Sequence, residues 1–394
     1  MKRLIVTVAA TAALLGATAT SAHATARQDV HRPDVHQLQA DADAILKQGA
    51  PGVIAEVSTP QGRTRIRAGF GNTETKQPVP WGAHFRIGSF TKTFVATTTL
   101  QLVGEGKVAL DAPVEKYLPG TVNNGAHITV RQLLQHTSGL PDYLAKMPFL
   151  STEEGFQANR YRTFTPKQLV ALSNEQKPLF APGTSWQYSN TNYVLVGMII
   201  EKVTGDDWRD QVYRRIIRPL GLRNTSLPRT SPGLPSPHAV GYERFPGPDA
   251  TETDPKYGEP IDATEQNPSW GEAAGEIIST TSDGNRFLRA LLSGQLLRPA
   301  QLAEMKKTVP AKPFEVLWPG ARYGLGLMSS TGPCGLVWSH GGDIMGFRTR
   351  NGVTEDGSRS VVVSLNSDSL KPEPGAPKLD QDVALQLIED GLCA

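Results

Sequence analysis

The chain of 394 residues has only two cysteines and almost no net charge, and it lacks a long hydrophobic run outside its first residues. Two cysteines exclude a disulfide scaffold, and 20% charged against 39% hydrophobic residues exclude a disordered chain. Without the first 24 residues, which carry two basic side chains and no acid, the net charge of +2 disappears. A chain without a positive field lacks the attraction that nucleic acid requires, so we expect no nucleic-acid partner.

The first 24 residues have the pattern of a secretory signal peptide. Two basic residues precede an apolar run over 4–17, and Ala22-His23-Ala24 places small residues beside a cleavage point after Ala24. Ala26 offers a second cleavage point. Because the apolar run is shorter than the ~20 residues of a spanning helix, we expect a secreted protein without a membrane anchor. Residues 25–33 are expected to form a flexible lead.

Cys334 and Cys393 are the only cysteines. In an exported protein, an isolated pair is expected to be bridged. Closing the loop between them would stabilise the fold by about 4 kcal/mol on the chain-entropy model. Two cysteines are too few for a zinc site, and the eight histidines show no paired-His spacing. We therefore predict no metal and no cofactor.

Hydrophobic periodicity predicts strands near both ends of the chain and helices between them. Strands are predicted over 53–58, 63–70, 323–328, 336–340, 346–351 and 360–366, and helices over 35–48, 94–103, 193–203, 283–292, 379–390 and from 129. This distribution favours one antiparallel sheet built from both ends of the chain. The segment 225–272 is rich in proline and glycine, and we interpret it as a long loop region that could line a site.

Ser89 and Lys92 form a Ser-x-x-Lys motif at the start of a predicted helix. If Ser89 begins that helix, Lys92 lies one turn further on the same face. A serine nucleophile needs a neighbour that takes its proton, and a desolvated, unprotonated lysine can do this. Such a motif occurs by chance about once in a chain of this length, so a helix cap followed by a solvated lysine is the alternative for the motif alone.

Two further motifs follow in the order that acyl transfer needs. Tyr188-Ser189-Asn190 precedes an apolar helix, and His340-Gly341-Gly342 ends a predicted strand. Taken singly, the first is a loop tyrosine and the second a glycine turn with an exposed histidine. Together with Ser89 and Lys92 they supply a nucleophile with its base, a phenol–amide pair, and a glycine strand edge that lets a substrate backbone approach.

This combination resembles the serine β-lactamase and penicillin-binding peptidase superfamily. Within it, the chain looks most like the secreted actinobacterial D-alanyl-D-alanine carboxypeptidases and the relatives of class C β-lactamases. The resemblance extends from about 35 to 393. It includes Leu133-Leu134-Gln135-His136-Thr137-Ser138-Gly139-Leu140, Trp186-Gln187-Tyr188-Ser189-Asn190-Thr191-Asn192-Tyr193, Asn267-Pro268-Ser269-Trp270 and Tyr323-Gly324-Leu325-Gly326-Leu327.

The resemblance implies an α/β (α+β) fold, the β-lactamase/DD-peptidase fold. In it, an antiparallel sheet is flanked by terminal helices and an all-helical lobe is inserted, with the site between the two. We expect one hydrolase domain over 34–394, with a sheet lobe from about 34–88 and 318–394. The helical lobe and the site loops would occupy about 89–317.

The resemblance also implies a role for each catalytic residue. Ser89 would attack a carbonyl carbon and form an acyl-enzyme, and Lys92 would accept its proton. Tyr188 would protonate the leaving group and then activate water, with help from His340. Asn190 would hold the substrate amide.

The third motif and Trp270 are expected to contact the substrate. Gly341 and Gly342 would form the strand edge, and the backbone N–H groups of Ser89 and Asp343 would form the oxyanion hole. Trp270 is either a wall of the site or a buried core tryptophan.

Three positions depart from the carboxypeptidase pattern. Met328 stands where those enzymes place an arginine that helps hold the substrate carboxylate, and Gly341 and Asp343 replace hydroxyl residues. An acidic side chain where a carboxylate docks weakens binding by repulsion. We expect a D-alanyl-D-alanine carboxypeptidase-like hydrolase of D-amino-acid peptides, with a D-aminopeptidase, amidase, esterase or β-lactamase as the alternative.

A binding protein or sensor that reacts with penicillin without turnover is the alternative outside enzymes. Two other hydrolase classes do not fit, because the chain has no Gly-x-Ser-x-Gly elbow and no trypsin-like order of Ser, His and Asp. The expected partner is a D-amino-acid-containing peptide or a β-lactam-like substrate. We expect a monomer.

Overall fold

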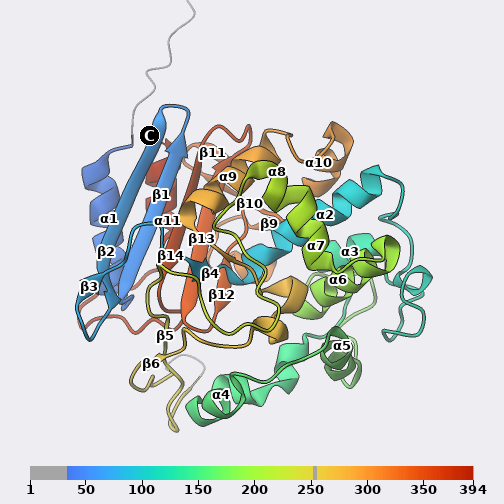
Figure 1. Ribbon diagram of the computed structural model, residues 1–394, viewed down its shortest axis with the longest axis horizontal. Helices are drawn as coiled ribbons and strands as arrows, with labels where there is room; N and C mark the ends of the chain where they lie inside the picture. The colour runs from blue at the N-terminus through green and yellow to red at the C-terminus, as the bar shows by residue number, and fades with distance from the viewer. Residues whose placement is uncertain (1–32, 252–254, 394) are drawn as a thin grey trace, which may run out of the picture. The chain divides into compact units, whose positions relative to one another are not determined.

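The central feature of the fold is an antiparallel sheet whose strands come from both ends of the chain (Figure 1). The computed structural model describes residues 33–251 and 255–393, so the predicted signal peptide and residues 25–32 of the predicted lead lie outside the described residues. The strands are β1 (Gly52–Thr59), β2 (Gly62–Asn72), β3 (Gln77–Pro78), β8 (Val309–Pro310), β9 (Arg322–Tyr323), β10 (Met328–Gly332), β11 (Gly335–Ser339), β12 (Gly342–Ile344), β13 (Phe347–Thr354) and β14 (Ser360–Leu365). Their order is β3-β2-β1-β14-β13-β11-β10-β9-β8, with β12 paired to β13.

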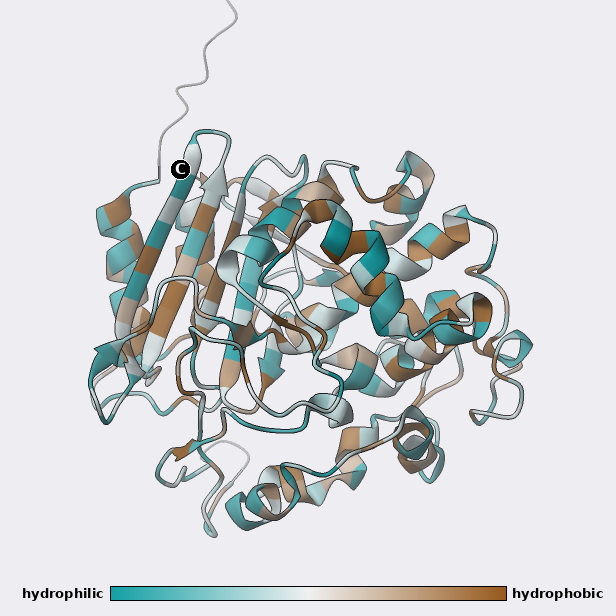
Figure 2. Cartoon of the chain, viewed as in Figure 1, coloured by the Kyte–Doolittle hydropathy of each residue, from teal (hydrophilic) through white to brown (hydrophobic). Residues whose placement is uncertain are grey.

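The pairing of β1 with β14 joins the two ends of the chain. Ala55 lies opposite Val363 on one side and opposite Ile66 of β2 on the other. Every residue of β1 and β14 is buried, whereas β2 has exposed positions along its length. Figure 2 shows the same contrast as a long brown stretch on β1 beside a mostly teal β2. The prediction of one sheet from both ends is confirmed.

Helices cover both faces of this sheet. Helix α1 (Val35–Lys47) and helix α11 (Leu385–Cys393) pack together on one face, in a hydrophobic cluster that includes Val361 and Val363. Val362 points to the opposite face, where it joins the cluster that contains Phe287 of α9 (Thr281–Leu292). This alternation follows from the two-residue period of a strand and explains why β14 is buried on both faces and has valine at three successive positions.

The remaining helices form most of the second hydrophobic cluster. They are α2 (Thr91–Gly104), α3 (Val130–Gln135), α5 (Pro166–Asn174), α6 (Asn190–Thr204), α7 (Trp208–Val212), α8 (Arg218–Leu220) and α10 (Pro299–Met305). Helix α4 (Glu153–Asn159) packs instead through Phe156 in a small separate cluster with Phe245. The capping box expected at 129–132 is present, because Thr129 and Gln132 each accept from the other's backbone N–H. Helices α2 and α6 contact each other, and this contact positions the site.

The structure corrects several predicted elements. The strand predicted over 323–328 is instead β9 and β10 with a turn between them, because Gly326 has φ +75° and its N–H donates to Leu134 O. The C-terminal helix begins at Leu385, six residues later than predicted. Strand β12 was missed, since two glycines hide its pattern. Strand β8 extends the sheet into the segment that was assigned to the helical lobe.

The segment predicted as a long loop holds two short strands, β5 (Tyr242–Glu243) and β6 (Ile261–Asp262). A further pair is formed by β4 (Phe85–Arg86) and β7 (Ile278–Ser279). This pair joins the segment just before Ser89 to the segment before α9.

The predicted bridge between Cys334 and Cys393 is confirmed, and it ties the β10–β11 turn to the end of α11. Among the described residues, no helix combines the length and hydrophobicity needed to cross a membrane.

Candidate active site

Ser89 and Lys92 lie side by side at the start of α2, as their spacing predicts. Ser89 sits in a short 3₁₀ turn, Gly88–Phe90, and Lys92 follows in the first turn of α2. Lys92 Nζ lies 2.9 Å from Ser89 Oγ, and the lysine is completely buried. Ser89 is partly exposed at the wall of a cavity, so a substrate can reach its hydroxyl.

The surroundings of Lys92 fit a neutral amine. Its Nζ also lies 2.7 Å from Asn190 Oδ1 and 2.7 Å from Ala274 O, two oxygens that can only accept. An amine has two N–H bonds and one lone pair, so with both N–H groups used the lone pair faces the Ser89 hydroxyl. Burial lowers the pKa of Lys92 to about 7, although nearby Asp142 acts in the opposite direction. Lys92 can therefore take the serine proton at neutral pH.

Tyr188 lies on the other side of this pair. Its ring centroid is 4.9 Å from Lys92 Nζ and 5.5 Å from the ring of Phe314. Burial raises the pKa of Tyr188 well above its ordinary value, and a hydrogen bond with the Ser89 side chain opposes this change. Tyr188 therefore keeps its phenolic proton at neutral pH and is suited to donate it.

Asn190 begins α6 and is oriented by Asp142. Asp142 Oδ2 accepts from the backbone N of Asn190 at 3.0 Å and from its Nδ2 at 2.8 Å. This contact turns Asn190 Oδ1 toward Lys92 and leaves the second N–H bond of the amide for a substrate. The sequence reasoning missed Asp142, because a single acid in a loop carries no distinguishing pattern.

Strand β12 packs directly against the turn that carries Ser89. A Cβ atom on Gly342 would lie 1.9 Å from Ile87 O and 2.8 Å from Ser89 N. Gly88 has φ +50°, and a Cβ atom there would lie 2.9 Å from Asp343 N. Only glycine allows this approach at both positions, and it brings the N–H groups of Ser89 and Asp343 to the same edge of the cavity.

His340 is buried and neutral. Its Nδ1 lies 2.7 Å from Gly341 O and must donate to it, so its Nε2 accepts from the Tyr323 hydroxyl at 2.8 Å. Burial lowers the pKa of His340 to about 3. Its ring centroid is 6.4 Å from that of Tyr188, and no hydrogen bond joins the two within the described chain. The predicted help from His340 to Tyr188 is therefore not a direct contact.

A buried chain of hydrogen bonds connects the second and third motifs instead. The N–H of Ser189 donates to His136 Nδ1 at 3.3 Å, so His136 Nε2 carries the proton and donates to the Tyr323 oxygen at 3.2 Å. Tyr323 then donates to His340. Burial lowers the pKa of His136 well below its ordinary value. The sequence alone assigned no role to His136 or Tyr323, because their proximity depends on the fold.

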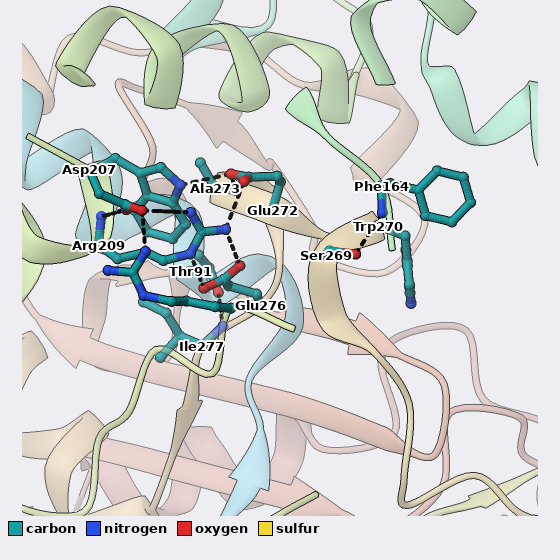
Figure 3. Close-up of polar contacts among 12 residues, drawn as sticks. Thr91, Phe164, Asp207, Arg209, Ser269, Trp270, Glu272, Ala273, Glu276 and Ile277 are labelled. Atoms are coloured by element: carbon teal, nitrogen blue, oxygen red, sulfur yellow. Dashed lines mark hydrogen bonds and ion pairs between the residues drawn. The ribbon is translucent and has the colours of Figure 1, made fainter. Parts of the chain in front are cut away.

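The Ala274 carbonyl that contacts Lys92 lies in the segment between Glu272 and Glu276. These two residues form a buried ion cluster with Arg209 (Figure 3). Arg209 lies 2.7 Å from Glu272 Oε1 and 2.6 Å from each oxygen of Glu276. Glu272 has φ +46°, which is uncommon for a residue with a side chain, and the arginine fixes it. Burial raises the pKa of Glu276 to about 8, against the effect of Arg209. This cluster was also missed, because Arg209 lies more than 60 residues before both glutamates in the sequence.

The catalytic candidates open into a cavity of about 280 Å³. Phe314, Leu317 and Trp318 form an apolar wall, and Met328 lines the cavity as expected from its motif position. The full lining consists of Ser89, Tyr188, Asn190, Phe314, Leu317, Trp318, Met328, His340, Gly341, Asp343 and Arg350. The apolar wall comes from a segment that the sequence reasoning had not assigned to the site.

Two expected contributors do not line this cavity. No described residue of 225–272 belongs to its wall, so the prediction for this loop region is not supported. Trp270 packs against the cluster of the helical lobe, and its carbonyl accepts from the Tyr143 hydroxyl at 2.5 Å. Figure 3 shows it beside Ser269, whose hydroxyl accepts from Phe164 N at 2.9 Å. The position of Trp270 therefore favours a role in core packing over a role as a wall of the site.

This fold and this site define a serine hydrolase with a Ser-x-x-Lys centre between a sheet and a helical lobe. The family model described as "Beta-lactamase" matches residues 24–385. The chain belongs to the β-lactamase family, as the sequence motifs predicted.

Several relatives act on D-amino-acid derivatives by name. A D-stereospecific amidohydrolase from a Streptomyces species is 42% identical, with a TM-score of 0.78, over 86% of this chain and 96% of that chain. A D-amino acid amidase from Ochrobactrum anthropi SV3, solved with L-phenylalanine amide, is 29% identical, with a TM-score of 0.74, over 90% and 96%. A D-aminopeptidase from Cereibacter sphaeroides is 30% identical over 85% of this chain and 61% of its own length. The chain spans 60% to 66% of the length of the curated relatives it matches first.

Proposed function

We propose that the chain is a D-stereospecific amidohydrolase that cleaves amides, esters or peptides of D-amino acids through an acyl-enzyme at Ser89. The observation that carries the proposal is the contact of 2.9 Å between Ser89 Oγ and the buried Lys92 amine, at the wall of a cavity with an apolar side. The names of the Streptomyces and Ochrobactrum neighbours support the choice of D-amino-acid amides. The apolar wall favours an apolar substrate side chain.

In the proposed acylation, Ser89 Oγ attacks the substrate carbonyl carbon as its proton moves to Lys92 Nζ. The oxyanion is stabilised by the N–H groups of Ser89 and Asp343. Tyr188 gives its phenolic proton to the leaving amine as the C–N bond breaks. The resulting phenolate lies next to the Lys92 ammonium, which stabilises it.

Deacylation reverses these proton transfers. Water attacks the acyl carbon and gives a proton to the Tyr188 phenolate, and the Lys92 ammonium returns its proton to the departing Ser89 oxygen. The products are a carboxylic acid and an amine, and every group of the enzyme regains its starting protonation state. Asn190 and Asp142 hold Lys92 in place during both steps.

A panel of substrates tests this proposal. D-phenylalanine amide is expected to be hydrolysed about tenfold faster or more, in kcat/KM, than its L enantiomer. Faster release of D-alanine from a D-alanyl-D-alanine peptide would favour the carboxypeptidase, and rapid turnover of a chromogenic β-lactam would favour a β-lactamase. A burst of acylation without turnover on every substrate would indicate a binding protein.

We also propose that the protein is exported, with cleavage after Ala24 or Ala26. The disulfide between Cys334 and Cys393 supports this proposal, because such bonds persist in oxidising compartments. Expression in a secreting bacterial host is expected to give extracellular protein whose N-terminal sequence begins at Thr25 or Arg27. Cell-associated protein that retains its first 24 residues would contradict export.

A further inference from the structure

Asp343 lines the cavity, and its side chain contacts two arginines, Arg348 and Arg350, of which Arg350 also lines the cavity. Its carboxylate is half-exposed, at 50%, and lines the cavity together with Arg350. Asp343 Oδ1 accepts from Arg350 Nη1 at 2.8 Å and lies 3.3 Å from Arg348 Nε. Both arginines come from β13, which pairs with β12 so that Asp343 lies opposite Arg348.

Arg350 does not depend on Asp343 for its position. Its side chain is only 5% exposed, and its Nε donates to Asp382 Oδ2 at 2.6 Å on the side away from Asp343. Its Nη1 also donates to Thr349 O at 2.9 Å. A guanidinium held in this way would keep its place, and its charge, if the Asp343 carboxylate were removed.

The two arginines change the effect that Asp343 is expected to have on a substrate carboxylate. The sequence reasoning assumed that Asp343 repels a substrate carboxylate as an isolated negative charge, whereas the structure shows it paired with two cations. Although desolvation raises it, Arg350 and Arg348 hold the pKa of Asp343 below its ordinary value. The ionised carboxylate therefore occupies donors that otherwise suit a carboxylate ligand.

We propose that Asp343 is a built-in substitute for a substrate carboxylate, which fills the Arg348–Arg350 pair and so excludes leaving groups that end in a free carboxylate. The inference rests on the proposed function and names its substrate class: D-aminoacyl compounds whose leaving group is neutral, such as amides, esters and carboxyl-blocked peptides. The inference also explains why an arginine in the cavity does not make it a carboxypeptidase site. Asp343 occupies Arg350, and Met328 supplies no second cation.

Asp343→Asn tests the proposal, because it removes the charge and keeps the shape and the backbone N–H. The substrates are D-Phe-D-Ala with a free and with an amidated C-terminus, each with and without N-terminal acetylation. The native enzyme is expected to prefer the amidated pair. The ratio of kcat/KM for the free-acid peptide to kcat/KM for the amidated peptide is expected to rise by about tenfold or more in Asp343→Asn. The rise should be the same for the acetylated and the unacetylated peptides.

Asp368→Asn is the matched control. Asp368 lies 3.4 Å from the same Arg348 Nε, but it does not line the cavity. The pKa of Asp368 is raised well above its ordinary value by burial and by Asp343, so this substitution is expected to change the charge beside Arg348 less than Asp343→Asn does. Its ratio of kcat/KM values is expected to equal that of the native enzyme.

Binding gives a second readout that does not depend on turnover. In the Ser89→Ala background, calorimetry is expected to show N-acetyl-D-Phe-D-Ala binding about tenfold tighter or more after Asp343→Asn, and its amide binding unchanged. If no D-substrate were hydrolysed but this change in affinity appeared, the proposed function would fail and the carboxylate site would stand. Equal changes in affinity for the acid and the amide would overturn the inference. A change in affinity that depends on N-acetylation and not on the C-terminus would also overturn it, because it would assign Asp343 to the substrate ammonium.

Discussion

Replacing Ser89 with alanine is expected to lower kcat/KM by about 10⁴-fold or more, because the proposed mechanism has no other nucleophile. The substitution deletes one oxygen from a partly exposed residue, so the thermal midpoint is expected to change little. The loss of activity should therefore appear without loss of fold. Hydrolysis of D-phenylalanine amide and thermal unfolding measured on the same preparation check both expectations.

Covalent labelling identifies the nucleophile directly. A fluorophosphonate is expected to add once to the native protein, on the peptide that contains Ser89, and not at all to Ser89→Ala. Ser282→Ala is a suitable control, since Ser282 lies on α9 outside the cavity wall and contacts Arg63. An adduct on any other residue, or a Ser89→Ala enzyme that keeps a tenth of the native activity, would rule out the assignment.

The parts of the site that the sequence predicted are those that local spacing determines. The turn between Ser89 and Lys92 requires only that α2 forms, because residues three apart on a helix are neighbours. The sheet from both chain ends was predictable because the sequence patterns that indicate strands lie near the two ends of the chain and few lie between them. The bond between Cys334 and Cys393 followed from their isolation in the sequence.

The parts that the sequence did not predict depend on contacts between distant segments. The Ala274 carbonyl that receives a Lys92 N–H is a backbone group, and alanine gives no chemical signal. Arg350 lies in a strand, where its burial against Asp382 is a product of the fold. The predicted strand over 323–328 hid a turn at Gly326, so the approach of Tyr323 to His340 was not visible.

These missed contacts share one physical role, which is to hold charged or proton-bearing groups where water is excluded. A buried lysine is costly unless its N–H groups are all bonded, and Asn190 and Ala274 bond them. Asp142 orients the first of these acceptors, and the Arg209 cluster positions the segment that carries the second. The low pKa of Lys92 thus results from burial that the surrounding contacts make possible.

Replacing Lys92 is expected to lower the rate of acylation by about 10³-fold or more, because it removes the only proposed base for Ser89. Lys92→Met keeps most of the aliphatic length in a fully buried site, whereas Lys92→Ala leaves a cavity, so the two variants separate chemistry from packing. Both should lose acylation to a similar extent, and Lys92→Met should keep the circular dichroism of the native protein. The rate of fluorophosphonate labelling measures the attack of Ser89 that Lys92 assists, with Lys107→Ala, outside the cavity wall, as the lysine control.

The same assignment fixes the direction of the pH dependence. Burial lowers the pKa of Lys92 to about 7, and only the amine can accept the serine proton, so kcat/KM should rise with pH through about 7. At high pH, kcat/KM should fall when Tyr188 loses the phenolic proton that it donates. Burial raises the pKa of Tyr188 well above its ordinary value, so activity should persist beyond pH 10 before it declines. The two pKa values that the pH profile reports belong to the coupled Lys92–Tyr188 pair and not to either residue alone. A flat profile between about pH 6 and 8 would show that Lys92 is not the titrating base, as would an unchanged acid limb in Lys92→Met.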